Sequence, residues 1–110
     1  MYVNENAVVN MENTLKIAAD KTRLKILFSL LDENRTVKEC CEVEKCVNDI
    51  SLQIGASQSL VSHQLKVLKD GHFVKTRKEG TKIYYSLADE HVREIIHITF
   101  EHVMEDQNDD

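Results

Sequence analysis

The sequence predicts a mainly α-helical domain that contains one β-hairpin. Two patterns predict this fold class: apolar residues recur at spacings of three and four along most of the chain, and two short runs rich in Val, Ile, Tyr and Thr flank a glycine near residue 80. With 42% hydrophobic and 30% charged residues, the composition is that of a folded protein. The 110 residues contain no proline, and no repeat or low-complexity linker divides them, so we expect one domain over residues 1–110.

The N-terminal part of the chain predicts two helices. Residues 1–8 are expected to be frayed. Residues 9–19 and 21–31 follow, and their apolar residues have helical spacing: Leu15, Ala18, Ala19, Leu24, Ile26, Leu27, Leu30 and Leu31. Residues 32–45 are acidic, contain Cys40 and Cys41 and show no clear period, so a loop or an irregular extension is expected there.

The middle of the chain predicts a helix-turn-helix. Ile50 and Ile54 lie four residues apart, and Gly55 follows them as a helix stop. Ser57 is suited to cap a new helix that extends to about residue 70. Two helices joined by a tight turn therefore precede the hairpin.

The hairpin and one further helix complete the domain. Residues 73–77 and 82–87 are the expected strands, and they flank Glu79, Gly80 and Thr81. Residues 89–105 have apolar side chains at spacings of three and four, which is typical of one amphipathic helix. Residues 106–110 form an acidic tail. A helix-turn-helix followed by a hairpin is a winged helix-turn-helix domain.

The distribution of charge points to nucleic acid. The net charge of −5 argues against such a partner, but residues 63–82 contain six basic and two acidic residues, so this stretch is +4 and the remainder is −9. The helix after Ser57 turns by about 100° per residue, which places its polar residues in one arc. An isolated polar helix face is usually just solvated, but here a basic hairpin follows it directly. The predicted DNA-binding residues are Gln58, Ser59, Ser62, His63, Lys66, Lys69, Arg77, Lys78 and Lys82, with Lys75 adding charge to the hairpin.

These segments resemble a known family. The runs from Val47 to Leu68 and from Gly80 to Leu87 are similar to the ArsR/SmtB metalloregulators, with a Ser-His-Gln-Leu core and a Tyr-Tyr strand at the family's spacing. The resemblance covers about residues 15–105. It implies a homodimer, built from the first and last helices, that represses transcription by binding double-stranded operator DNA at an imperfect inverted repeat.

The last helix contains two pairs of candidate zinc ligands. Asp89 and His91 form one pair, and His102 and Glu105 form the other. His91 and His102 are eleven residues apart, about 16 Å along a helix, so one chain cannot place both pairs on one ion. Two antiparallel helices from two chains can, which gives two equivalent sites per dimer. Imidazole and carboxylate ligands match zinc, or cobalt, better than cadmium or arsenite.

Spacing alone leaves open that these are scattered polar residues on a surface helix. The resemblance favours the site, because all four positions match the last-helix zinc site of the zinc-responsive SmtB/CzrA-like branch of the family. It implies a repressor that binds the operator when metal-free and is released when zinc binds.

The three cysteines give an alternative sensor. Cys40, Cys41 and Cys46 are an odd number in one region, which favours reduced thiols or metal ligation over disulfides. Thiolate-dependent branches of the family have Cys-Val-Cys-Asp where this chain has Asn48 in place of the second cysteine. A thiol-based redox or soft-metal repressor using Cys40, Cys41 and Cys46 therefore remains open.

Other protein classes fit less well. No apolar run approaches the roughly 20 residues that cross a bilayer, and no signal segment is evident, so we expect a cytoplasmic protein without a membrane partner. We do not expect an enzyme, because four protein ligands would leave no open position on zinc and no phosphate-binding glycine loop is present. A zinc-binding protein or zinc enzyme without DNA binding is disfavoured by the basic hairpin.

Overall fold

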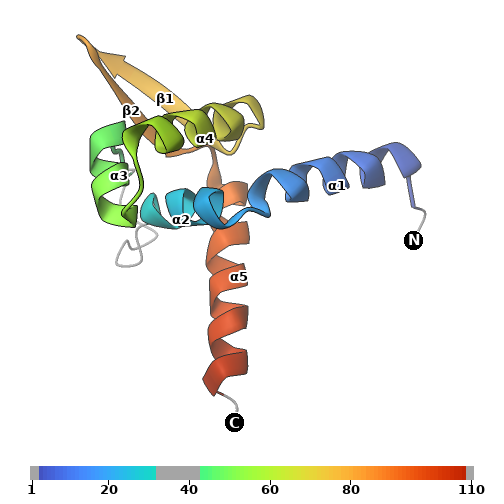
Figure 1. Ribbon diagram of the computed structural model, residues 1–110. Coiled ribbons are helices and arrows are strands. Elements are labelled where there is room, and N and C mark those ends of the chain that lie inside the picture. The colour runs from blue at the N-terminus through green and yellow to red at the C-terminus, as the bar shows by residue number, and fades with distance from the viewer. Residues whose placement is uncertain (1–2, 32–42, 109–110) are drawn as a thin grey trace.

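The computed structural model describes residues 3–31 and 43–108, with the side chains described up to residue 105. Within these ranges it shows five helices and one hairpin (Figure 1). The predicted class, mainly α with a β-hairpin in a winged helix-turn-helix arrangement, is confirmed. The elements in chain order are α1 (Glu5–Ala18), α2 (Lys21–Ser29), α3 (Val47–Ile54), α4 (Gln58–Asp70), β1 (Val74–Glu79), β2 (Lys82–Leu87) and α5 (Glu90–Asn108).

Both end helices are longer than predicted. The expectation that residues 1–8 are frayed is wrong for residues 5–8, because the Asn4 side chain accepts hydrogen bonds from the backbone N–H groups of Asn6 (2.9 Å) and Ala7 (3.3 Å) and so starts α1 at Glu5. Helix α5 continues to Asn108, into the expected acidic tail of residues 106–110. No glycine or proline stands there to end it.

The predicted helix-turn-helix is present, and its turn follows from two residues. Gly55 adopts φ 70°, a left-handed conformation that ends α3. The Ser57 hydroxyl accepts a hydrogen bond from the backbone N–H of Leu60 at 3.1 Å and thereby caps α4. The second helix of the motif is therefore capped at its start by Ser57, as the sequence predicts.

The hairpin is antiparallel, with pairs from Val74 and Leu87 to Glu79 and Lys82. A third segment joins its outer edge, since the backbone of Lys45 exchanges two hydrogen bonds with Tyr85, at 3.0 and 2.8 Å. The irregular segment predicted for residues 32–45 therefore ends in contact with the sheet, while residues 32–42 lie outside the described residues.

The buried core lies among α2, α3, α4 and the start of the hairpin. Its fully buried side chains are Ile26, Leu27, Ile50, Val61, Leu65, Leu68 and Phe73. Helices α1 and α5 contribute little to it: the buried apolar residues of α1 are limited to Ala18, and those of α5, over its described side chains, to Val92 and Ile96. Figure 1 shows both helices projecting from the core in different directions. Among the described helices, none is long and apolar enough to cross a membrane.

Candidate nucleic-acid interface and metal-ligand positions

Helix α4 presents a polar face to solvent. Val61, Leu65 and Leu68 are buried and hold the helix against the core. The opposite side exposes all six residues predicted for DNA contact on this helix: Gln58, Ser59, Ser62, His63, Lys66 and Lys69. Leu60, an apolar residue of the same helix, is 40% exposed beside them. The helix therefore offers short polar side chains in its first turns and lysines toward its end, an arrangement that suits a major groove with flanking phosphates.

Two side chains of this face, Gln58 and Lys66, contact other residues of the same chain. The Gln58 side-chain amide donates to Asn48 Oδ1 on α3 at 2.9 Å. Lys66 Nζ lies 3.3 Å from Asp70 Oδ2, one turn further along α4, and both side chains are largely exposed. An exposed pair of this kind contributes at most about 1 kcal/mol, so phosphate can displace the carboxylate. The lysines of α4 therefore remain accessible to a polyanion.

The hairpin adds cations, although one of them is already paired. Lys78 and Lys82 are exposed near its tip. Arg77 donates to Glu44 Oε2 at 2.9 Å and to Glu79 Oε2 at 2.8 Å, and its guanidinium lies over the Tyr84 ring at 4.9 Å. The hydrogen bond with Glu44, followed by that with Glu79, raises the pKa of Arg77 above its ordinary value. Sequence reasoning missed Glu44, because the segment before it has no periodic pattern from which a contact with the hairpin could be inferred.

The four predicted zinc ligands lie at the two ends of α5. Asp89 precedes the helix, and its Oδ1 accepts a hydrogen bond from the backbone N–H of Val92 at 2.9 Å. His91 follows in the first turn, whereas His102 and Glu105 lie in the C-terminal part, and all four are exposed. Over the described residues of one chain, no three His, Cys, Asp or Glu side chains are grouped closely enough to hold a metal ion. A site made from both pairs therefore requires a second chain and stays a prediction.

The cysteine alternative is only partly within the described residues. Cys46 is half-buried at the N-cap of α3, and its thiol donates to Asp49 Oδ2 at 3.2 Å. Cys40 and Cys41 lie outside the described residues.

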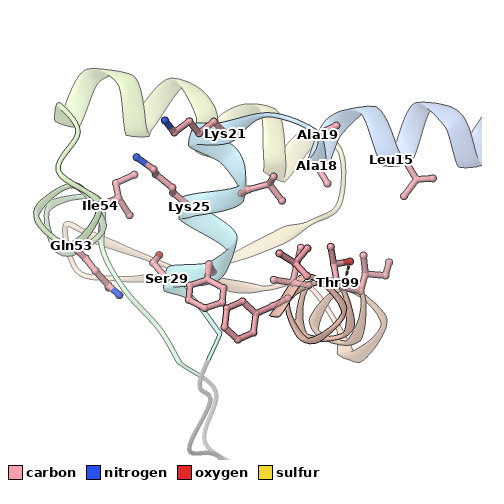
Figure 2. A pocket seen from close by; sticks show the side chains of 15 residues that line it. Leu15, Ala18, Ala19, Lys21, Lys25, Ser29, Gln53, Ile54 and Thr99 are labelled. Atoms are coloured by element: carbon pink, nitrogen blue, oxygen red, sulfur yellow. Dashed lines mark hydrogen bonds between the residues drawn. The ribbon is translucent and has the colours of Figure 1, made fainter. Parts of the chain in front are cut away.

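An apolar groove runs between α1, α2 and α5 (Figure 2). Its volume is about 880 Å³, and the rings of Phe28 and Phe100 meet in it with centroids 4.9 Å apart. Leu15, which is 55% exposed, lines it from α1, and Val103 lines it from α5. The apolar periodicity of the end helices was visible in the sequence, but it did not show that these faces stay uncovered within one chain.

Comparisons with known proteins agree with this architecture. Residues 41–76 match the family model described as "Bacterial regulatory protein, arsR family". The chain is 36% identical over 97 residues to the cadmium resistance transcriptional regulatory protein CadC homolog of Staphylococcus aureus, covering 88% of this chain and 73% of that protein. It is also 36% identical over 87 residues to the transcriptional repressor SmtB homolog of Synechocystis, covering 79% of this chain and 58% of that protein.

A solved structure resembles nearly the whole chain. It is the homodimeric winged helix-turn-helix DNA-binding domain of Mb0332 from Mycobacterium bovis, a possible ArsR-family regulator. The TM-score is 0.79 at 25% identity, and the match covers 99% of this chain and 94% of that one. The similarity therefore extends over the end helices as well as the helix-turn-helix.

Proposed function

Because the chain belongs to the arsR family of bacterial regulatory proteins, we propose that it is a dimeric, metal-sensing repressor that binds operator DNA when metal-free and is released by zinc. One observation supports this proposal above the others. Two pairs of candidate zinc ligands lie at opposite ends of α5, a helix whose apolar face is left open, with Ile98 61% exposed. A second copy of α5 would cover that face and complete the ligand sets at the same time.

The dimer is supported by what the monomer leaves uncovered. Helix α1 exposes Val9, Met11 and Leu15, and α5 exposes Ile98 and Val103. Apolar patches of this extent usually mark an interface. The homodimeric state named for Mb0332, which this chain resembles along almost its full length, supports the same assembly. We propose that α1 and α5 of two chains form the shared core.

The proposed dimer presents two copies of α4 on one side. Two recognition helices related by a twofold axis meet half-sites about one helical turn of DNA apart, which corresponds to an imperfect inverted repeat. Gln58, Ser59, Ser62 and His63 are the proposed groove residues, and Lys66, Lys69, Lys78 and Lys82 the proposed phosphate contacts. The SmtB homolog is named a transcriptional repressor, which supports a repressor here.

Asp89 and His91 of one chain, with His102 and Glu105 of its partner, would hold the metal. The residues present fit zinc: two imidazoles and two carboxylates suit tetrahedral coordination, and Asp89 caps α5 through Oδ1, which leaves Oδ2 to act as a ligand. Bound at this position, zinc or cobalt would supply bonds that join the ends of two helices. With these side chains held together, the two α5 helices would be fixed relative to each other. The separation of the two α4 helices would then be fixed as well. A fixed separation that mismatches the half-sites lowers affinity by about 1–3 kcal/mol on the usual scale of such coupling.

The test is DNA binding by the purified protein with and without stoichiometric zinc. Fluorescence anisotropy on the DNA upstream of its own coding region should show binding without metal and an affinity about 5–150-fold lower with zinc. A His91→Ala, His102→Ala double variant should bind the same DNA and lose the response. If the metal-free protein binds no better than the zinc-loaded one, the proposal is wrong.

The cysteines remain the second candidate sensor. The CadC homolog is named for cadmium resistance, and cadmium favours thiolate ligands. The same titration on a Cys40→Ser, Cys41→Ser, Cys46→Ser variant separates the two. Release by zinc that survives these substitutions supports the α5 site, whereas release by cadmium or an oxidant that they abolish supports the thiols.

A further inference from the structure

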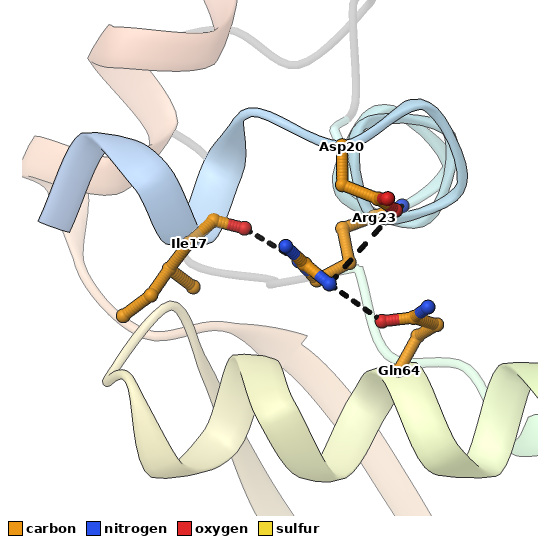
Figure 3. A network of polar contacts seen from close by, with 4 residues as sticks. All are labelled: Ile17, Asp20, Arg23 and Gln64. Carbon is orange, nitrogen blue, oxygen red and sulfur yellow. Dashed lines mark hydrogen bonds and ion pairs between the residues drawn. The ribbon is translucent and has the colours of Figure 1, made fainter. Parts of the chain in front are cut away.

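One partly buried arginine connects α1 with α4 (Figure 3). Arg23, on α2, donates from Nε to the carbonyl oxygen of Ile17 at 2.6 Å and from Nη1 to Gln64 Oε1 at 2.8 Å. Asp20 accepts from the backbone N–H of Arg23 at 3.0 Å, and its carboxylate lies 4.0 Å from Nη1. A single side chain therefore contacts the last turn of α1 and the middle of α4.

The contact with Ile17 satisfies a group that the helix itself leaves open. The last four carbonyls of a helix have no partner within it, and the negative end of the helix dipole favours a cation there. The planar guanidinium holds its N–H groups in a rigid fork, so one bond to Ile17 and one to Gln64 fix the separation of these two acceptors. The Arg23 side chain is 18% exposed, which limits competition from water.

A second contact joins the same two helices. Gly71 follows the last residue of α4, and a Cβ atom built on it would lie 2.5 Å from Ile17 Cδ1. Ile17 at the end of α1 thus contacts Gly71 directly and is connected to Gln64 through Arg23. Because these two points along α4 are about two helical turns apart, they restrict rotation of α4 about the end of α1 more than either connection alone.

We propose that Arg23 is a positioning residue for DNA recognition, which fixes the direction of α4 relative to α1. The inference rests on the proposed function, in which α1 belongs to the dimer core and α4 enters the groove. In that assembly, the distance between the two recognition helices depends on how rigidly each α4 is held to its own α1. Arg23 makes that connection through Gln64, without contacting DNA or metal.

The first readout is the geometry of one chain. Gln64→Leu removes the acceptor, and Gln64→Glu is the matched variant that keeps it. Spin labels at positions 10 on α1 and 70 on α4 are introduced with the native cysteines replaced by serine, and labelled chains are diluted with unlabelled protein so that only distances within a chain are measured. The parent and Gln64→Glu should give one narrow distance distribution. Gln64→Leu and Gly71→Ala should broaden or shift it, and an unchanged distribution in Gln64→Leu would overturn the proposal.

The second readout compares a full inverted repeat with a single half-site, using unlabelled protein. Gln64→Leu should bind the half-site as the parent does and bind the full repeat about tenfold more weakly, because the two helices no longer engage together. Gln64→Glu should restore full-repeat binding. Equal losses on both duplexes would show a merely structural role and overturn the proposal. If the parent binds neither duplex, the proposed function and the role in DNA recognition both fail, while the distance measurement still decides whether Arg23 fixes α4 to α1.

Discussion

Arg77 carries a positive charge, but its guanidinium is already bound to other side chains of the same chain. Its place on the basic hairpin predicts a phosphate contact, yet Glu44 and Glu79 each accept a hydrogen bond from it, and Tyr84 lies beneath its guanidinium. Its side chain is half exposed, so these ion pairs are screened by solvent and are weak. Glu44 is thus a weak competitor for the cation that DNA would use.

Glu44→Gln is therefore expected to increase DNA affinity. Removing one of the two carboxylate partners makes Arg77 more available to phosphate, and the gain should be about two- to fivefold at low salt and vanish as salt screens the contact. Anisotropy titrations at two salt concentrations measure it. Glu12→Gln on α1 is the matched control, since it removes the same charge from an exposed pair with Lys16. An equal gain in the control would attribute the effect to net charge and contradict the specific role of Glu44.

For single residues, the sequence predicts exposure where apolar and polar positions alternate with a regular period. The exposed face of α4 follows from its helical period, and all six side chains predicted there are exposed. Glu44 could not be paired with Arg77 in advance, because they are 33 residues apart and the segment before Glu44 has no regular pattern. The contact between Arg23 and Gln64 could not be inferred either, because the two residues are 41 positions apart in the sequence.

Among the elements, two helix ends use the left-handed backbone conformation with different residues. Helix α3 ends at Gly55 with φ 70°, where glycine has no Cβ to strain. Beyond α4 the residue with positive φ is His72, at 63°, and Phe73 then donates to the Leu68 carbonyl at 2.8 Å. A side chain in this conformation costs roughly 1–2 kcal/mol. The turn after α4 is therefore strained where the turn after α3 is not.

Opposite effects on stability follow for the two positions. His72→Gly should raise the free energy of unfolding by about 0.5–1 kcal/mol, because the relief of strain exceeds the entropy that glycine adds to the unfolded chain. Gly55→Ala should lower it by about 1 kcal/mol, although nothing lies within 4 Å of the added methyl group. Urea unfolding at one fixed protein concentration measures both. A stabilising Gly55→Ala would show that the turn can readjust, against the argument from φ.

Element types are predictable from this sequence, and element ends less so. Gly55 and Ser57 are strong local signals, and the turn between α3 and α4 forms where they predict it. The start of α1 depends on Asn4, a capping residue in a stretch without apolar pattern, and was therefore missed. Helix α5 extends past its apolar period because nothing in residues 106–108 stops it.

At the scale of the whole molecule, the sequence does not predict what covers the apolar faces of α1 and α5. An amphipathic helix has the same sequence pattern whether its apolar face packs on its own chain or on another. The structure shows that one chain leaves Leu15 and Val103 exposed in the apolar groove, and it separates the two candidate ligand pairs along α5. Both features have one explanation if a second chain packs there, and that explanation can be tested through the metal.

Complementation between two defective chains tests the shared sites. One variant, Asp89→Ala with His91→Ala, lacks the first pair of ligands, and the other, His102→Ala with Glu105→Ala, lacks the second. Each variant alone should bind no zinc tightly, because every site in its dimer is half empty. In a mixed dimer, isolated with two different affinity tags, one site loses all four ligands and the other keeps all four. Titration should therefore find one tight zinc per mixed dimer, against two for the parent.

The mixed dimer distinguishes sharing from any arrangement within one chain. If each chain used its own four ligands, both chains of the mixed dimer would be defective, and no tight zinc would bind. The two ligand pairs lie about 16 Å apart on one rigid helix, so only exchange between chains restores a complete set. Absence of zinc binding in a mixed dimer that is otherwise folded and stable would contradict the shared site, and would leave the cysteines as the sensor to test next.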